Sequence, residues 1–465
     1  MPVPPTPAPT PSRRVGTFGI GLAVITVLGL AGRVTSVLAT RGDTDLCGYD
    51  LCGDALYYSA QAHVLGQGQG FTDFFDATVQ TADHPPLTAA FLAPVSFVLG
   101  GETSPVTAQR LTMALVGALV IIAVGFLGRR VGGRRGTSVG LIAAAIAAVN
   151  ANFWMNDIIV MSETLGTLGI VVVLLLIYRF VDRPSLGRAA AVGAAVGVTM
   201  LARAELALFL PVTFAPMVLW ARTLTVPARI GRIALAGVCA LVVLLPWTIH
   251  NLGRFENPVL ISTNDGLTLV GANCDDVYGV RDQGGIGFWS LNCAERLRPT
   301  IPADADQSEV SAAYREIAVE YISNHQRLIP EVVAFRIGRA TGLYAPADMT
   351  WLNMGEGRAR WASWVGMVQW YVLVPIAIAG AVVLRRRRFP VWPLVSTGVI
   401  VLVTVVAFYG IVRFRLPADV AVVVLAAVAI DAGFRRLRGR PSTGDADGSG
   451  AASDADATAV REPVA

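Results

Sequence analysis

Long apolar runs separated by short polar connections dominate this chain. A transmembrane helix needs about 20 mostly apolar residues to cross roughly 30 Å of hydrocarbon. Ten runs approach that length, and the shorter ones need tilt or cover from neighbouring helices. The expected spans are Val15–Leu38, Val106–Leu127, Ser138–Phe153, Ile158–Phe180, Ala189–Leu201, Leu206–Trp220, Ile233–Ile249, Trp364–Leu384, Trp392–Val412 and Pro417–Phe434. The pattern predicts an all-α polytopic membrane protein with about ten transmembrane helices.

The composition agrees with this prediction. Hydrophobic residues make up 54% of the chain and charged residues only 15%, whereas average soluble domains carry about 25% charged residues. The mean hydropathy is +0.57. These values argue against a water-soluble globular protein.

The distribution of basic residues predicts how the helices are oriented. All 37 basic residues are Arg, and positively charged connections tend to stay on the cytoplasmic side of a membrane. With the N-terminus inside, every Arg-rich connection falls on that side. The connections contain Arg129, Arg130, Arg134 and Arg135; Arg179, Arg183 and Arg188; Arg222, Arg229 and Arg232; Arg385–Arg388; and Arg435, Arg436, Arg438 and Arg440. We therefore expect a multi-pass plasma-membrane protein with both termini in the cytoplasm.

This topology divides the chain into five parts. We expect a disordered leader (1–14), a transmembrane core (15–249) that includes a first external loop (39–105), and a large extracytoplasmic loop domain (250–363). C-terminal transmembrane helices (364–434) and a disordered cytoplasmic tail (435–465) complete the chain. The apolar run Leu87–Leu99 has only 13 residues, so it is expected to lie in the outer interface without crossing.

Four of the five Cys residues lie in the two external segments, and the fifth, Cys239, lies within a span. An even number of external Cys is typical of an oxidising compartment. Four Cys permit three pairings, of which Cys47–Cys52 with Cys274–Cys293 is the simplest. A zinc site is the competing interpretation, but the external Cys and His lack the spacing of a zinc finger.

Ionisable residues near the outer membrane surface are the main candidates for a functional site, because charge at membrane depth is costly. Glu163, Arg203 and Glu205 interrupt apolar stretches there. The alternative is that Glu163 and Arg203 form an ion pair that holds the bundle together. Three further ionisable residues fall within spans, close enough to an end to reach the interface: Arg33, Arg110 and Asp431.

The first external loop adds a second group of candidates at the same depth. A helix is expected from about Gly53 to Leu65, with Asp54, Tyr57 and Tyr58 on one face, and His84 follows later in the loop. Asp54 also suits a helix N-cap, and the two Tyr suit an interfacial aromatic anchor. The depth shared with Glu163 and Arg203 favours interfacial chemistry over transport.

Two more groups are expected near that surface. Asn264 lies in a segment rich in Gly, Asn and Asp, which predicts turns and a pocket rim. Arg413 and Arg415 lie between two spans, where they are placed to bind a lipid phosphate. For a single external Arg, attraction to anionic lipid headgroups is the alternative.

Taken in order, several motifs resemble the GT-C class of polytopic glycosyltransferases, and most nearly the family-39-like enzymes related to protein O-mannosyltransferases and aminoarabinose transferases. The resemblance extends over about 15–434. The motifs are Gly53-Asp54-Ala55-Leu56-Tyr57-Tyr58 with Gly66, Gly68 and Gly70, His84-Pro85-Pro86-Leu87, Met161-Ser162-Glu163, Arg203-Ala204-Glu205, Pro246-Trp247-Thr248, Ser262-Thr263-Asn264 and Arg413-Phe414-Arg415-Leu416-Pro417.

The resemblance implies a GT-C fold, with external juxtamembrane helices and a mixed loop domain, and an inverting glycosyltransferase. The donor would be a polyprenyl-phosphate-linked sugar and the acceptor a glycan, lipid or protein of the cell envelope, at the outer face of the plasma membrane. Asp54 matches the general base of this class. Many relatives have a second acidic residue next to the first, where this chain has Ala55; Asp45 or Asp50 is the alternative base.

The other expected site residues take supporting roles. Tyr57, Tyr58, His84, Glu163, Arg203, Glu205, Asn264, Arg413 and Arg415 are expected to bind substrate. Neither a cofactor nor a resident metal is expected, although scattered external Asp could bind a divalent ion weakly. Membrane lipids are expected partners and nucleic acids are not.

Two other classes of function fit a polytopic chain of this kind. A transporter or flippase of lipid-linked saccharides would show repeated halves with broken helices and mid-membrane charges, and the sequence shows neither. A non-catalytic scaffold would bind a partner through its external domain, but it gives no reason for acids and Arg to gather at one depth.

Overall fold

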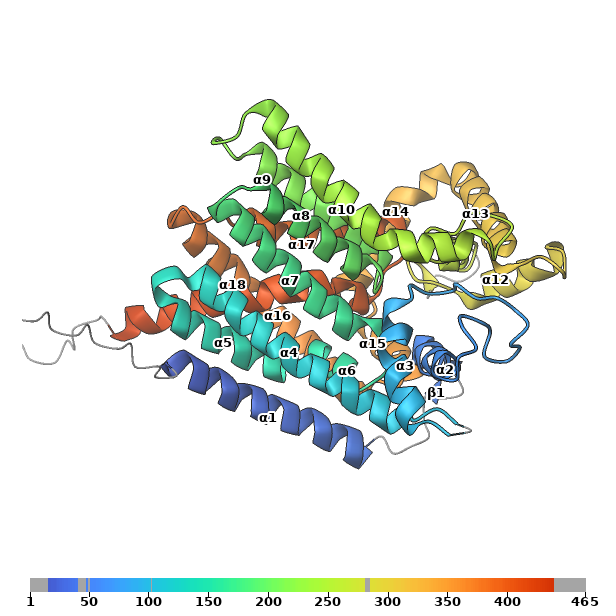
Figure 1. Ribbon diagram of the computed structural model, residues 1–465, viewed down its shortest axis with the longest axis horizontal. Helices are drawn as coiled ribbons and strands as arrows, with labels where there is room; N and C mark the ends of the chain where they lie inside the picture. The colour runs from blue at the N-terminus through green and yellow to red at the C-terminus, as the bar shows by residue number, and fades with distance from the viewer. Residues whose placement is uncertain (1–15, 41–46, 49–50, 102, 281–284, 439–465) are drawn as a thin grey trace, which may run out of the picture.

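The protein is a bundle of long helices with a smaller group of helices at one end (Figure 1). The computed structural model describes residues 16–40, 47–48, 51–101, 103–280 and 285–438; the side chains of residues 40, 47, 48, 51, 52 and 438 are outside this description. The bundle contains α1 Thr17–Thr40, α4 Val106–Gly132, α5 Gly136–Val149, α6 Ala151–Asp157, α7 Ser162–Asp182, α8 Leu186–Met200, α9 Ala215–Leu219, α10 Val226–Leu252, α16 Arg360–Arg386, α17 Trp392–Ala407 and α18 Leu416–Arg438.

Each of the ten expected spans contains helical residues, and the chain is a multi-pass membrane protein. Six segments are long and apolar enough to cross a membrane: Thr17–Ala39, Val106–Val149, Ser162–Asp182, Val226–Leu252, Arg360–Arg386 and Val412–Leu437. Four apolar helices are shorter, α3 Leu87–Leu99 among them. Ten crossings therefore stay a prediction. The expected span Leu206–Trp220 is irregular, because it combines η2 Ala204–Leu208, the π-helix η3 Phe209–Phe214 and α9.

The centre of the bundle is the last helix. In Val412–Leu437, 72% of the most apolar stretch is buried, whereas the corresponding share for the spans that contain α1, α10 and α16 is 22% each. Glycine lets the outer helices approach closely, which is how helices commonly pack in membranes. A Cβ atom at Gly380 on α16 would collide with the Leu425 carbonyl of α18, and one at Gly193 on α8 with the Ala236 carbonyl of α10.

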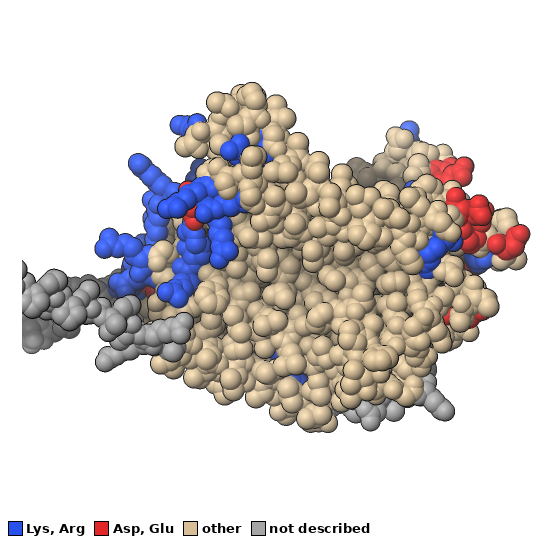
Figure 2. Space-filling view, viewed as in Figure 1, with Lys and Arg blue, Asp and Glu red and all other residues tan. Residues whose placement is uncertain are grey.

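The two ends of the bundle differ in charge. Arg side chains gather at the end where the described chain begins and finishes, acidic side chains gather at the other end, and the surface between them is almost free of charge (Figure 2). The basic end is formed by the Arg-rich connections between the long helices. Arg129 and Arg130 lie in the last turn of α4, and Arg385 and Arg386 lie in the last turn of α16. The positive-inside rule predicts that this end is cytoplasmic, and the orientation stays a prediction.

The opposite end carries the two segments that the sequence predicts to be external, and we call them the external segments. The first loop forms a two-residue strand pair, β1 Cys47–Gly48 with β2 Leu51–Cys52, followed by α2 Asp54–Gly66 and α3. The expected helix from Gly53 to Leu65 is therefore present as α2. The second segment contains α11 Asn264–Ala272, α12 Leu291–Leu297, α13 Gln307–Asn324, α14 Ile329–Thr341 and α15 Pro346–Gly355, together with the 3₁₀ turns η5 Arg298–Thr300 and η6 Gln326–Leu328. Two further 3₁₀ turns link the spans, η1 Gly133–Arg135 and η7 Val412–Arg415.

Three ionisable residues within the spans differ from the expectation that they reach the interface. Arg33, Arg110 and Asp431 are 2%, 1% and 4% exposed, so their side chains lie inside the protein. Arg33 Nε donates to Asp157 Oδ2 at 2.8 Å, and Thr164 Oγ1 donates to the other oxygen of Asp157. The pair joins α1 to α6 and satisfies a charge that would otherwise be costly at this depth.

Candidate active site

The candidate site is a cavity of about 330 Å³ between the external segments and the ends of α17 and α18. Asp54 is the first residue of α2, where a carboxylate is favoured by the helix dipole. His84 precedes Pro85 and Pro86, which fix the backbone just before α3 begins. Arg413 lies in η7, directly before α18. Three separate segments of the chain thus place their side chains on one cavity.

Arg413 is the centre of an ion-pair network. Its Nη1 lies 2.8 Å from Asp54 Oδ2 and 2.6 Å from Glu356 Oε1, and its Nε lies 3.7 Å from Glu163 Oε1. Glu356 also pairs with Arg358. One guanidinium therefore connects carboxylates from α2, from α7 and from the loop after α15.

A second Arg, Arg203, joins the same network through Glu163. Arg203 Nη1 donates to Glu163 Oε1 at 2.7 Å, and Arg203 Nε donates to Glu205 Oε1 at 2.6 Å. Glu163 is fully buried, whereas the Glu205 side chain is 21% exposed. The Glu163–Arg203 ion pair that the sequence allowed as a structural alternative is present, and it lies against the cavity.

His84 connects Asp54 to the external domain. Its Nε2 lies 3.3 Å from Asp54 Oδ1, and Asn264 Nδ2 lies 2.8 Å from its Nδ1. Thr268 donates to Asn264 Oδ1, so the amide NH₂ of Asn264 faces the imidazole. An NH₂ group donates only to an unprotonated nitrogen, which leaves the ring proton on Nε2, facing Asp54. Tyr58 stacks on the imidazole ring at 5.1 Å between centroids.

These contacts set the protonation of the carboxylate. Burial alone would raise the pKa of Asp54, but Arg413 and His84 outweigh it and hold the pKa well below its usual range. For His84, burial opposes the charged form, yet Asp83 and Asp54 raise the pKa above its usual value. The Asp54 side chain is 29% exposed. The site therefore presents an ionised, accessible carboxylate at neutral pH.

The structure brings most of the expected site residues together. Asp54, Tyr58, His84, Arg203, Glu205, Asn264 and Arg413 line the cavity, and Glu163 lies beneath it. Tyr57 is not in the lining and packs edge-on against the His84 ring. Arg415 lies elsewhere: it is 1% exposed, its Nε lies 3.4 Å from Asp419, and Trp370 covers its guanidinium. Asn264 lies in the first turn of α11, where the sequence had predicted turns.

Several residues around the cavity were missed by the sequence reasoning. Glu356 lies in Gly355-Glu356-Gly357-Arg358, where the two glycines flanking a single acid were the available signal for a shaped loop. Phe408, Tyr409 and Phe414 form an aromatic wall. Phe408 and Tyr409 belong to an expected apolar span, whereas Phe414 lies between two expected spans and drew attention only as part of a motif. Asp83, whose Oδ2 lies 3.8 Å from His84 Nε2, is a second carboxylate near Asp54.

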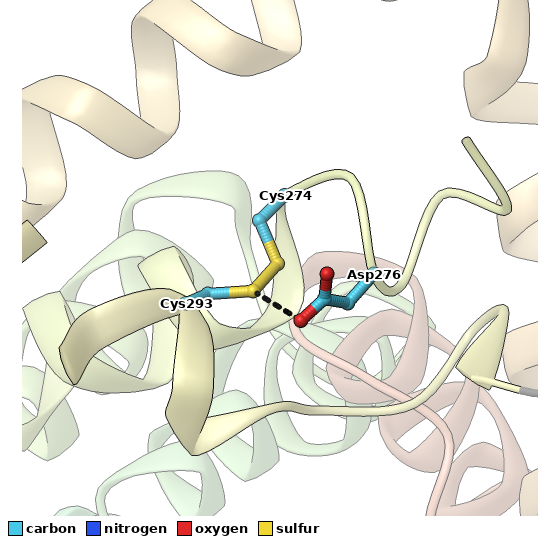
Figure 3. Close-up of side chains that lie close together, drawn as sticks. All are labelled: Cys274, Asp276 and Cys293. Atoms are coloured by element: carbon cyan, nitrogen blue, oxygen red, sulfur yellow. Dashed lines mark hydrogen bonds between the residues drawn. A yellow bond between two sulfur atoms is a disulfide. The ribbon is translucent and has the colours of Figure 1, made fainter. Parts of the chain in front are cut away.

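The external Cys residues are described in part. Cys274 and Cys293 form a disulfide that ties the end of α11 to α12, with Asp276 Oδ2 3.6 Å from Cys293 Sγ (Figure 3). These three residues form a metal-ligating group by distance alone. Because the sulfurs are bonded to one another, neither is available as a thiolate ligand. The backbones of Cys47 and Cys52 pair in register; their side chains, and Asp45 and Asp50, lie outside the described residues.

Comparisons with known proteins place this architecture. Residues 83–250, about a third of the chain, match the family model described as dolichyl-phosphate-mannose-protein mannosyltransferase. The oligosaccharyltransferase of Archaeoglobus fulgidus in its apo form superposes with a TM-score of 0.53 at 14% identity, over 91% of this chain and 51% of that one. The same enzyme with an inhibitory peptide and a dolichol-phosphate gives 0.51 at 12% identity, over 90% and 51%.

A third structure is less similar overall. ArnT of Cupriavidus metallidurans, bound to undecaprenyl phosphate, gives a TM-score of 0.40 at 18% identity, over 90% of this chain and 79% of that one. Comparison with curated protein sequences gives no match. The chain spans about half the length of the archaeal enzyme. Its fold is that of the archaeal oligosaccharyltransferase, in agreement with the GT-C fold that the sequence motifs implied.

Proposed function

We propose that this protein is an inverting glycosyltransferase that moves a sugar from a polyprenyl-phosphate donor to an acceptor hydroxyl at the outer face of the plasma membrane. The observation that carries the proposal is Asp54, an ionised and accessible carboxylate in a cavity shared by membrane helices and the external domain. The matched family model and the dolichol-phosphate bound to the archaeal enzyme of this fold agree with a lipid-phosphate donor.

The geometry suits a single displacement. The acceptor O–H gives its proton to Asp54 while its oxygen bonds to the anomeric carbon, from the face opposite the lipid phosphate. The bond between that carbon and the phosphate oxygen breaks, and the electron pair leaves with the lipid phosphate. Asp54 then returns the proton to water. The products are an inverted glycoside and the lipid phosphate.

Two Arg side chains are placed to stabilise the departing phosphate. Arg413 and Arg203 both line the cavity, and cations positioned where charge develops lower the barrier in such a site. Phe408 and Phe414 give the same cavity an apolar wall on the side of α17 and α18. A donor with a charged head and an apolar tail fits this division.

The test is transfer of radiolabelled sugar from polyprenyl-phosphate donors to cell-envelope acceptors by the purified protein. Loss of a general base typically costs about 100- to 10,000-fold in rate, so Asp54→Asn is expected to lose that much. The matched control is Asp265→Asn, a carboxylate of the same cavity that pairs with Arg315, and it is expected to retain transfer within about threefold.

Two results would contradict the proposal. Transfer by Asp54→Asn at the rate of the unchanged protein would remove Asp54 as the base. Movement of lipid-linked sugar across vesicles without any transfer would identify a flippase instead.

A further inference from the structure

A second cavity, of about 700 Å³, lies on the external side of the candidate active site. Its size is within the range of about 300–1,000 Å³ that is usual for ligand pockets. No residue of the six candidate spans lines it. Its lining is Thr78, Val79, Gln80, Asp83, Arg254, Phe255, Thr263, Leu267, Arg298, Ala303, Asp304, Ala305, Asp306, Gln307, Val310, Ser311 and Tyr314. We call it the outer cavity.

Residues that are neighbours in the sequence line the outer cavity and the candidate active site, so the two cavities adjoin. Asp83 lines the outer cavity and His84 the active site; Thr263 and Asn264 divide in the same way, as do Leu267 and Thr268. The carboxylates of Asp54 and Asp83 both lie close to His84 Nε2, at 3.3 Å and 3.8 Å respectively. A hydroxyl held at Asp83 is therefore close to the proposed base.

The two cavities suit different substrates. On one side, the active-site cavity is bounded by Thr404, Phe408 and Phe414, which lie in or just after the apolar helix α17, whereas the outer cavity is bounded only by residues of the external segments. An inverting displacement needs the acceptor oxygen on the face opposite the leaving phosphate. With the lipid phosphate on the membrane side, the acceptor reaches the sugar from the external side.

The polar groups of the outer cavity include donors and acceptors together. Gln307 Oε1 accepts from Thr81 and Ala82, while its amide NH₂ makes no hydrogen bond within the described part of the chain. The lining carries three carboxylates and two guanidinium groups: Asp83, Asp304, Asp306, Arg254 and Arg298. Both Arg already donate to oxygen atoms of the protein, so the excess of carboxylates disfavours an anionic ligand. Hydroxyl groups, which donate and accept, match a mixed set of this kind.

The shape of the lining separates two kinds of hydroxyl acceptor. Extended peptides commonly bind by adding a strand to an exposed sheet edge. The described residues that line this cavity lie in loops, turns and the helices α11 and α13, apart from Gln80, which forms an isolated β-bridge with Thr72 and belongs to no sheet. We propose that the outer cavity binds a neutral, hydroxyl-rich glycan and delivers one of its hydroxyls to Asp54. This inference rests on the proposed function and specifies its acceptor.

The experiment blocks the outer cavity without altering the catalytic residues. Ala303 lines the cavity and is exposed, so Ala303→Cys can be labelled with a bulky maleimide. The matched control is Val319→Cys on α13, a residue that is 57% exposed and does not line the cavity. Native membrane vesicles supply the natural acceptor, and radiolabelled polyprenyl-phosphate sugar supplies the donor.

We expect labelled Ala303→Cys to lose at least about tenfold in the rate of transfer, while labelled Val319→Cys keeps its rate. The radioactive product of the active proteins is expected to resist protease and to be cleaved by periodate. Equal rates for the two labelled proteins would overturn the role of the cavity. A product that protease releases would overturn the glycan and point to a protein acceptor.

A direct binding measurement separates this inference from the proposed function. The probes are the neutral trisaccharides maltotriose, mannotriose and cellotriose, added to purified protein and followed by saturation-transfer NMR. If the protein without the maleimide label transfers no sugar, the proposed function fails. The role of the outer cavity as a glycan site is then decided by trisaccharide binding alone. Binding that the label on Ala303→Cys abolishes supports a glycan site; no binding, or binding that the label leaves unchanged, overturns it.

Discussion

The pairing of Arg413 with Asp54 predicts a large effect of Arg413→Gln on the pH dependence of transfer. The two charges lie 2.8 Å apart, which corresponds to about 6 kcal/mol at an effective dielectric constant of 20 and about 1.5 kcal/mol in water. Asp54 is 29% exposed, so an intermediate value of about 3 kcal/mol is appropriate. At 1.36 kcal/mol for each pKa unit, the pKa of Asp54 should rise by about 2 units.

The direction of the change follows from the proposed role of Asp54 as the base. Asp54 removes a proton only when ionised, so the rate falls as the pH drops through its pKa. In the unchanged protein that pKa lies well below the usual range, and the rate should show no acidic decline above about pH 5. In Arg413→Gln the decline should move upward by about 2 units. The stability that Asp54 contributes above the unfolded pKa, and loses at lower pH, should shrink as well.

The assay is the initial rate of transfer at saturating donor, measured from pH 4 to 8. The matched control is Arg415→Gln, which lies in the same turn and contacts Asp419 rather than Asp54. The control should keep the profile of the unchanged protein, even if its stability falls. An acidic decline in Arg413→Gln within about 0.3 units of the unchanged protein would refute the assigned electrostatic control.

Three further changes test other parts of the structure. His84→Phe keeps the ring that stacks on Tyr58 but loses the hydrogen bond to Asp54, so kcat/KM should fall by about 10- to 100-fold, and less in His84→Gln; equal losses would contradict this. Replacing Cys274 and Cys293 by Ser opens a loop of 19 residues and should lower external-domain stability by about 3 kcal/mol, measured as faster limited proteolysis under non-reducing conditions. Gly193→Ala should lower the melting temperature in detergent, because its Cβ would meet the Ala236 carbonyl; an unchanged temperature would show that α8 and α10 separate easily.

The fold class was accessible from the sequence because membrane helices leave a strong one-dimensional signal. Apolar length predicted helices for all ten segments, and the Arg clusters predicted one basic end, which the surface shows (Figure 2). Irregular helices leave no such signal. The combination of η2, η3 and α9 reads as one apolar run, since hydropathy does not register a change in hydrogen-bond spacing.

From the sequence, the candidate site could be predicted only where a charged residue interrupts an apolar stretch. Glu163 and Arg203 stood out because almost no other charges surround them in the sequence. Glu356 did not stand out, since acids are common in external loops and its contact with Arg413 depends on tertiary packing. Arg415 misled the prediction for the converse reason: it is two residues from Arg413, but it lies against Asp419 and Trp370.

The position of Arg413 has a consequence for biosynthesis. Asp54 and Glu163 are made early, whereas Arg413 immediately precedes α18. During synthesis Glu163 has Arg203 as an early partner, but the Asp54–Arg413–Glu356 contacts form only when the segment that leads into α18 joins the bundle. A chain that stalls before α18 would hold the acidic groups without their shared cation. The candidate active site is therefore complete only after η7 and α18 have been made, and products truncated before Arg413 are expected to be inactive.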